Sequence, residues 1–246
     1  MMTNTKEVWE LFSPEKPFSR EVRAFHHTNK GRVKSRVFRP VEYKLQTEFK
    51  RAVEQYAAEL NDQGYNVYFS LNPIKQTFTG TSASDDDILQ YEFLLIDLDR
   101  AGDTKNPATA REIELATELG EKILEFLSAL GWPQPKRVMS GNGHHLYYRL
   151  DDLPNDPESK KLIKQALNCL ADKFNTEDIE VDRVVFNSSR ITKFPGTVKH
   201  VCNFGTYQVE RTFDSIFIKV DIHRAIVVDT SLEEFFLARF GDGHDA

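Results

Sequence analysis

The chain has 246 residues, of which 40% are hydrophobic, and a formal net charge of −6. This is enough apolar material for one large domain or for two small lobes around a core. Its two cysteines exclude a disulfide scaffold and a four-cysteine zinc site. No apolar run approaches the roughly 18 residues that span a bilayer, and residues 1–6 lack the apolar segment of a secretory signal. We therefore expect a cytoplasmic protein with no membrane partner.

Near the N-terminus, one short segment departs from this acidic balance. Between Arg20 and Arg39 lie seven arginines and lysines against the single acid Glu21, so the segment carries a charge of +6. A basic stretch on an acidic body can follow a phosphate backbone. The alternative is a solvated loop, which is the more frequent form of a charge run. The candidate nucleic-acid-binding residues of this stretch are Arg32, Lys34, Arg36 and Arg39.

Hydrophobic periodicity predicts interleaved helices and strands along the whole chain. An amphipathic piece is expected around residues 8–12, and a polar loop over residues 77–87. Helices are predicted over residues 45–60, 108–130, 157–174 and 232–240, and strands over residues 66–71, 94–99, 137–139, 146–148, 179–186, 206–211 and 215–220. This order favours an α+β fold with two lobes around a largely antiparallel sheet.

The predicted strand over residues 94–99 ends in two carboxylates, Asp97 and Asp99. Alternate side chains of a strand share a face, so both carboxylates point the same way. Two such charges about 4 Å apart repel by roughly 4 kcal/mol at an effective dielectric constant near 20, and a divalent cation would relieve this repulsion. Oxygen ligands of this kind suit Mg²⁺ or Mn²⁺. Because Asp-x-Asp is a weak motif by itself, a solvated acidic turn is the alternative.

A second motif, Ser-Gly-Asn-Gly-His-His, occupies residues 140–145. Its two glycines predict a tight turn whose backbone amides can approach a ligand closely. Exposed N–H groups, the Ser140 hydroxyl and a histidine can all bind phosphate oxygens. Period-two alternation puts His145 on the polar face with Tyr147, and His144 on the other face. His145 is therefore the candidate ligand-facing residue, whereas an ordinary hairpin turn with two surface histidines is the alternative.

A third motif combines Asp182, on the predicted strand over residues 179–186, with a cation-rich loop over residues 187–199. Asp182 would complete a three-carboxylate metal site with the Asp-x-Asp pair, although a lone acid is more often a surface residue. Arg190, Lys193 and Lys199 would neutralise phosphate charge, and arginine is the better bidentate donor.

In their order and spacing, the three motifs resemble the archaeo-eukaryotic primase superfamily, and within it the primase-polymerase branch of phage and plasmid replication proteins. The resemblance covers roughly residues 67–199. It implies a two-lobed α+β primase-polymerase fold, in which an N-terminal α/β unit is paired with a catalytic unit like an RNA-recognition-motif sheet. The expected division is an N-terminal lobe over residues 1–88, a catalytic lobe over residues 89–205, and a hairpin and helix over residues 206–246 that complete the same domain.

The resemblance also implies a function, which is metal-dependent, template-directed nucleotidyl transfer by a DNA primase, a DNA polymerase or both. The expected cofactor is Mg²⁺ or Mn²⁺, bound by the catalytic residues Asp97, Asp99 and Asp182. The expected partners are a single-stranded DNA template and primer, deoxyribonucleotides or ribonucleotides, and a helicase in cis or in trans. The nucleotide-binding residues would be Ser140, Gly141, Gly143, His145, Arg190, Lys193 and Lys199.

The chain also departs from this pattern, and other functions stay open. Two cysteines cannot supply the zinc element of many relatives, and the chain lacks a Walker-type helicase motif. A tyrosine-type nicking initiator would need paired histidines on one side of a strand, whereas His144 and His145 are adjacent. A glycosyltransferase also uses Asp-x-Asp, but gives no reason for the glycine turn. A non-catalytic single-stranded nucleic-acid-binding module would explain the basic stretch but not three strand-borne aspartates.

Overall fold

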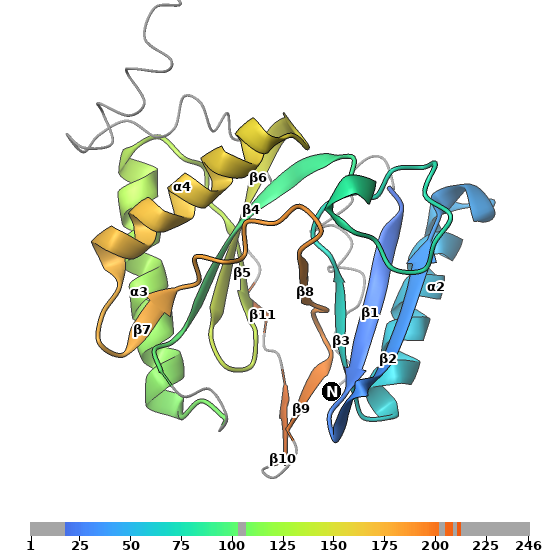
Figure 1. Cartoon of the computed structure of the whole chain (residues 1–246). Coiled ribbons are helices and arrows are strands. Elements are labelled where there is room, and N and C mark those ends of the chain that lie inside the picture. The colour runs from blue at the N-terminus through green and yellow to red at the C-terminus, as the bar shows by residue number, and fades with distance from the viewer. Residues whose placement is uncertain (1–17, 103–106, 202–204, 209–210, 213–246) are drawn as a thin grey trace, which may run out of the picture.

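The computed structural model describes residues 18–102, 107–201, 205–208 and 211–212. Within these residues, the two larger of three antiparallel sheets stand between helices that lie on their outer sides (Figure 1), and the third is a two-stranded ribbon. The elements predicted around residues 8–12, 215–220 and 232–240 lie outside the described residues. None of the helices among the described residues has the length and apolar character needed to cross a membrane.

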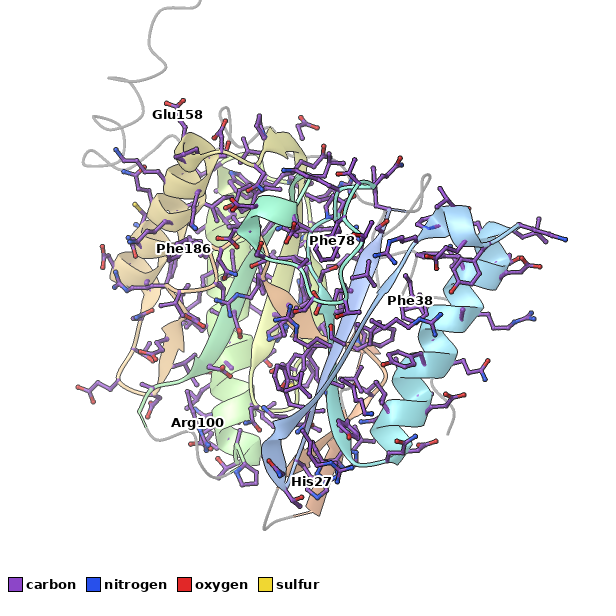
Figure 2. The ribbon with its side chains drawn as sticks, turned by 45° about the vertical axis from the view of Figure 1, so that its right-hand side comes forward. His27, Phe38, Phe78, Arg100, Glu158 and Phe186 are labelled. Carbon is purple, nitrogen blue, oxygen red and sulfur yellow. The ribbon has the colours of Figure 1, made fainter. Side chains whose placement is uncertain are left out.

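The N-terminal sheet has the strand order β2-β1-β3-β8. Its strands are β1 (Arg20–His26), β2 (Asn29–Phe38), β3 (Tyr65–Ser70) and β8 (Ile191–Lys193), and helix α2 (Gln46–Asp62) packs on it. Figure 2 shows Phe38 between β2 and α2, where its ring lies 5.5 Å from that of Tyr56. The basic stretch is therefore a hairpin and not a solvated loop, because alternate residues such as Val22 and Ala24 are fully buried.

The second sheet has the strand order β11-β5-β6-β4-β7, and two long helices pack against it. Each helix begins at a side-chain cap, since Thr109 accepts a hydrogen bond from the Glu112 N–H and Asp156 from the Ser159 N–H. The elements are β4 (Gln90–Arg100), β5 (Lys136–Met139), β6 (His144–Pro154), β7 (Ile179–Val181), β11 (Arg211–Thr212), α3 (Ala110–Ala129) and α4 (Pro157–Phe174).

The structure differs from the predicted elements in three places. Strand β7 ends at Val181 instead of residue 186, because the Asp182 side chain accepts a hydrogen bond from the Val184 N–H and turns the chain. The strand predicted over residues 206–211 contributes to two elements: β10 (Gly205–Gln208) pairs with β9 (Val198–Val201), and β11 pairs with β5. Finally, β8 belongs to the N-terminal sheet, so the segment over residues 89–205 does not stay within one sheet. The division of the chain into lobes by residue number stays a prediction.

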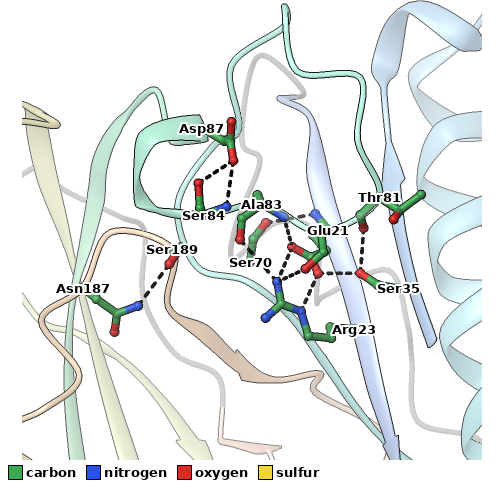
Figure 3. A network of polar contacts seen from close by, with 11 residues as sticks. Glu21, Arg23, Ser35, Ser70, Thr81, Ala83, Ser84, Asp87, Asn187 and Ser189 are labelled. Carbon is green, nitrogen blue, oxygen red and sulfur yellow. Dashed lines mark hydrogen bonds and ion pairs between the residues drawn. The ribbon is translucent and has the colours of Figure 1, made fainter. Parts of the chain in front are cut away.

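A buried acid on β1 fixes the loop that follows β3 to the N-terminal hairpin (Figure 3). The carboxylate of Glu21 accepts hydrogen bonds from Arg23, from Ser35 and from the backbone N–H of Ala83. The Ser35 hydroxyl also lies 2.7 Å from the Thr81 carbonyl oxygen. One cation of the basic stretch, Arg23, is thus paired within the lobe itself.

The two sheets are joined by a buried ion-pair network. Glu92 on β4 forms ion pairs with Arg20 on β1 and with Arg149 on β6, and all three side chains are at least nine-tenths buried. Beside them, the Asn72 side chain accepts a hydrogen bond from the Glu92 N–H at 2.8 Å and donates to the Ser188 carbonyl at 2.9 Å. Because buried charges must be compensated, this network fixes how the two sheets face each other.

We expect Glu92→Gln to destabilise the protein by about 3–5 kcal/mol, because it leaves two arginines buried without their shared counter-charge. Guanidinium unfolding followed by circular dichroism measures this loss. The matched control is Glu42→Gln, since Glu42 is 46% exposed and lies 3.4 Å from Arg39; we expect it to cost less than about 1 kcal/mol. Equal losses in the two variants would contradict a junction that depends on Glu92.

Candidate active site

A cavity of about 210 Å³ lies between the two sheets, on the faces that the helices do not cover. Polar residues that are far apart in the sequence meet in it, including both members of the Asp-x-Asp pair. Seven predicted site residues line the cavity, namely Asp97, Asp99, Ser140, His145, Arg190, Lys193 and Lys199, and they are joined by Tyr68, Leu95, Val185, Ile191 and Thr192.

Strand β4 presents its two carboxylates to this cavity by simple alternation. Ile96 and Leu98 are fully buried, and Leu98 reaches α3 at Gly120, so Asp97 and Asp99 face the other way. Burial, with the neighbouring charge of Asp97, raises the pKa of Asp99 to about 6. Two carboxylates therefore lie close together in a partly buried site, and the Asp99 carboxyl loses its proton at a higher pH than an exposed aspartate does.

His145 compensates one of the two carboxylates. It pairs in register with Asp97, and its Nε2 lies 3.1 Å from Asp97 Oδ1. Although burial opposes charge on both groups, their attraction lowers the pKa of Asp97 and raises that of His145. The other ring nitrogen, Nδ1, lies 2.8 Å from the Tyr147 hydroxyl, which is 2.7 Å from Thr192 Oγ1 on β8. This chain of contacts holds the imidazole ring across the gap between the sheets.

His144 lies on the opposite face of β6, as alternation predicts. It is 6% exposed, its Nδ1 is 3.4 Å from Thr117 of α3, and burial lowers its pKa to about 4. Two adjacent histidines that diverge in this way cannot bind one metal ion together.

The glycine turn brings the backbone close to the acidic pair. Gly141 has a φ of +97°, which favours glycine. A Cβ on Gly143 would lie 2.1 Å from the Leu98 carbonyl oxygen and 2.5 Å from Asp99 Oδ1, so no side chain fits there. The Ser140 hydroxyl accepts a hydrogen bond from the Gly143 N–H at 3.0 Å and lies at the cavity wall.

Three cations close the other side of the cavity. Arg190 donates to the Val184 carbonyl at 2.5 Å, and Lys193 donates to the Val198 carbonyl at 3.2 Å. Burial, with the nearby charge of Lys199, lowers the pKa of Lys193 to about 7. Burial also lowers the pKa of Lys199, whereas the two aspartates act in the opposite direction. The cavity thus places carboxylates on β4 opposite cations from β8, β9 and the loop before them.

Asp182 lies beside this site but does not line the cavity. Its backbone N–H donates to the Asp97 carbonyl at 2.8 Å, and its charge contributes to the raised pKa of Asp99. Its carboxylate, however, is bonded to the Val184 N–H at 2.7 Å. Among the described residues, no three His, Cys, Asp or Glu side chains form a group with metal-binding geometry. Of the three carboxylates predicted to form one site, Asp97 and Asp99 therefore line the cavity, and Asp182 lies beside them.

The candidate nucleic-acid-binding residues lie away from the cavity. Register places Lys34 opposite Ala24 and Arg36 opposite Val22, on the α2 side of the sheet. Arg32, Lys34 and Arg36 are exposed, and the Arg36 guanidinium also lies 4.4 Å from the centre of the Phe38 ring. Arg39 donates to the carbonyls of Phe78 and Gly80, so it fixes the loop after β3.

Tyr68 is a cavity residue that the sequence did not single out for the site. It lies on β3, and its ring centre is 5.6 Å from Lys193 Nζ. Burial and the charge of Asp97 raise the pKa of its hydroxyl. The only signal in the sequence is a polar-tipped residue between the core residues Val67 and Phe69.

The donor set at the acidic pair fits a hard divalent cation. Two carboxylates on one strand face supply oxygen ligands, and the raised pKa of Asp99 records a repulsion that a cation would relieve. The absence of a side chain on Gly143 also lets the backbone of the glycine turn approach Asp99 closely.

Comparison with solved structures identifies the fold. The chain matches the AEP domain of the cyanophage S-2L primase-polymerase with a TM-score of 0.54 and 14% sequence identity, over 92% of this chain and 97% of that domain. It matches the primase RepB′ with a TM-score of 0.55 and 12% identity, over 96% of this chain and 62% of that protein. No protein-family model and no curated protein sequence matches the chain. The α+β fold predicted from the motifs is confirmed as a primase-polymerase fold.

We expect Asp99→Asn to stabilise the protein at pH 7 by about 1–3 kcal/mol, because the folded state resists ionisation of this carboxyl. The folded pKa near 6 exceeds the ordinary value of 3.8, so the folded state binds more protons between about pH 4 and pH 6. The gain should therefore appear as the pH rises through that window and vanish below it.

Urea unfolding of the wild type and of Asp99→Asn at pH 3.5, 5 and 7 measures this difference. Glu177→Gln, which removes an exposed acid in the turn before β7, is the control and should change stability by less than about 0.5 kcal/mol at each pH. Destabilisation of Asp99→Asn at pH 7 would contradict the assigned repulsion.

Proposed function

We propose that this protein is a metal-dependent nucleotidyltransferase that extends or starts strands on a single-stranded DNA template. The observation that carries the proposal is the convergence of Asp97, Asp99, His145, Arg190 and Lys199, from four separate segments, on one cavity. Carboxylates face cations there across a space of about 210 Å³. A nucleoside triphosphate with its metal ions needs this combination. Its phosphate groups are held by cations, and its metal ions are held by carboxylate oxygens.

Asp97 and Asp99 would hold Mg²⁺ or Mn²⁺, with Asp182 supplying a third negative charge beside them. The bound ions would activate the primer 3′-hydroxyl and stabilise the charge that develops at phosphorus. His145 already neutralises part of the Asp97 charge and fixes the orientation of that carboxylate.

Ser140, Arg190, Lys193 and Lys199 would hold the triphosphate. In the reaction, the primer 3′-oxygen bonds to the α-phosphorus, the bond between that phosphorus and the oxygen bridging to the β-phosphate breaks, and pyrophosphate leaves. Fixed cations around the β- and γ-phosphates stabilise the leaving charge without reorganisation. Lys193 is buried and Lys199 is partly buried, and charges in such surroundings interact more strongly than charges in bulk water.

The geometry favours the two alternative functions less. A nicking initiator would use both histidines on one metal ion, yet His144 and His145 lie on opposite faces of β6. A passive nucleic-acid-binding module gives no reason for a buried acidic pair, whose charge would repel the DNA backbone.

We expect the double variant Asp97→Asn/Asp99→Asn to lose primer extension by at least about 10²-fold, because it removes both ligand charges. The assay incubates the protein with primed and unprimed single-stranded DNA, labelled nucleotides, and Mg²⁺ or Mn²⁺. Glu125→Gln, which neutralises an exposed acid on α3, is the control and should retain wild-type extension.

Each outcome of this assay supports a different one of the three functions. Extension that the double variant and a chelator both abolish supports nucleotidyl transfer. Cleavage of the DNA strand would instead indicate the nicking initiator. Tight DNA binding that is unchanged in the double variant, with neither extension nor cleavage, would indicate the passive module.

The basic hairpin provides an independent test of the DNA partner. If the strand passes along β2, Arg32→Ala/Lys34→Ala should reduce the salt dependence of single-stranded DNA binding, lowering the slope of log K against log salt by about 1.4. Fluorescence anisotropy over a range of salt concentrations measures this slope. The control removes two exposed lysines from the outer helices α3 and α4, Lys122→Ala/Lys161→Ala, and should leave the slope unchanged. Equal slopes in all three proteins would exclude the β2 path.

A further inference from the structure

Strand β9, which carries Lys199 to the cavity, is attached to the N-terminal lobe by side chains. Its backbone pairs with β10. The residues on either side of Lys199, Val198 and His200, are each bonded to an asparagine more than 130 positions earlier in the chain.

Both attachments use the same geometry. The Asn66 side chain donates to the His200 carbonyl at 2.9 Å and accepts from the His200 N–H at 2.8 Å. The Asn61 side chain donates to the Val198 carbonyl at 2.8 Å and accepts from the Val198 N–H at 2.8 Å. Each side-chain amide thus satisfies the donor and the acceptor of one residue, as a neighbouring strand would do.

The position of Asn61 supports a specific role for this arrangement. Asn61 is 7% exposed in the last turn of α2, where asparagine is a poor helix former, and a buried amide is costly unless it is hydrogen-bonded. Its backbone carbonyl also lies 2.9 Å from His200 Nε2, so the end of α2 holds both residues that flank Lys199.

This double attachment constrains the direction of one side chain. Alternation along a strand sends the side chain of Lys199 to the opposite face from those of Val198 and His200. Lys199 accordingly lines the cavity, where its charge acts to lower the pKa of both aspartates and of Lys193. With its amide oxygen turned toward the lysine, Asn142 of the glycine turn accepts a hydrogen bond from Lys199 Nζ at 2.9 Å.

We infer that Asn61 and Asn66 are positioning residues that hold Lys199 at the triphosphate subsite of the cavity. The inference rests on the proposed function, since it takes the ligand of Lys199 to be a phosphate group. It goes beyond that function by assigning a role to two asparagines that do not line the cavity.

A double-mutant cycle between Asn66 and Lys199 tests the inference, with inorganic triphosphate as the probe. If Asn66 acts through Lys199, Asn66→Ala should weaken triphosphate binding about three- to tenfold in the wild-type background. In the Lys199→Ala background the same change should weaken it less than about twofold, because the side chain to be positioned is absent. Isothermal titration calorimetry measures all four affinities, and thermal unfolding measures the stability loss of Asn66→Ala, which should be alike in both backgrounds.

The matched control is Asn155→Ala, because Asn155 also donates two hydrogen bonds to backbone carbonyls, those of Asp85 and Ile88. Its effect on triphosphate binding should be the same with and without Lys199. If Asn66→Ala does not fold, Asn66→Asp, which keeps the acceptor for His200 and loses the donor, gives the same cycle.

Equal effects of the Asn66 variant in both backgrounds would overturn the inference, as would no effect in either or no triphosphate binding by the wild type. Because binding of inorganic triphosphate needs no catalysis, the two proposals fail separately. Coupling without primer extension by the wild type would refute the proposed function alone. Extension by the wild type without coupling would refute the positioning role alone.

Discussion

The arrangement of this protein depends on placing two carboxylates side by side on a mostly buried strand face. Asp97 and Asp99 repel each other, and burial raises the pKa of Asp99 to about 6. Compensation has to come from elsewhere in the chain, because Ile96 and Leu98 are apolar and Arg100 alternates to the opposite face of β4, where it pairs with Glu112. His145 supplies part of it from β6, and Lys199 and Arg190 supply a further part from the opposite side of the cavity. The same unrelieved charge that costs stability makes the site suited to a cation and a polyphosphate.

Buried polar side chains set the relation between the two sheets. Glu92 joins arginines from both of them, and Asn72 links the start of β4 to the loop before Arg190. Asn61 and Asn66 likewise attach β9, the strand that carries Lys199, to the N-terminal lobe. Because hydrogen bonds are directional and apolar contacts are not, these side chains fix orientation, whereas the apolar core supplies most of the driving force for folding. Cations that must face an acidic pair across a cavity need such directional support.

The likeness to primase-polymerase structures at 12–14% identity is a likeness of fold. The proposed function rests instead on the cavity, where the residue types and their separation in space agree with one chemistry. Asp182 is informative here, because it is adjacent to the pair through a backbone hydrogen bond while its carboxylate is bonded to Val184. The proposed metal site is thus centred on two carboxylates of β4.

Features that depend only on neighbouring residues could be predicted from the sequence. The helices that became α2, α3 and α4, the shared face of Asp97 and Asp99, and the divergence of His144 from His145 all follow from side-chain spacing. Only the tertiary structure decided that the basic stretch is a hairpin, that β7 stops before Asp182, and that Tyr68 and Thr192 belong to the cavity. Pairing between distant strands and hydrogen bonds across more than 130 residues leave no periodic trace in the sequence, because they depend on which surfaces meet after the local elements have formed.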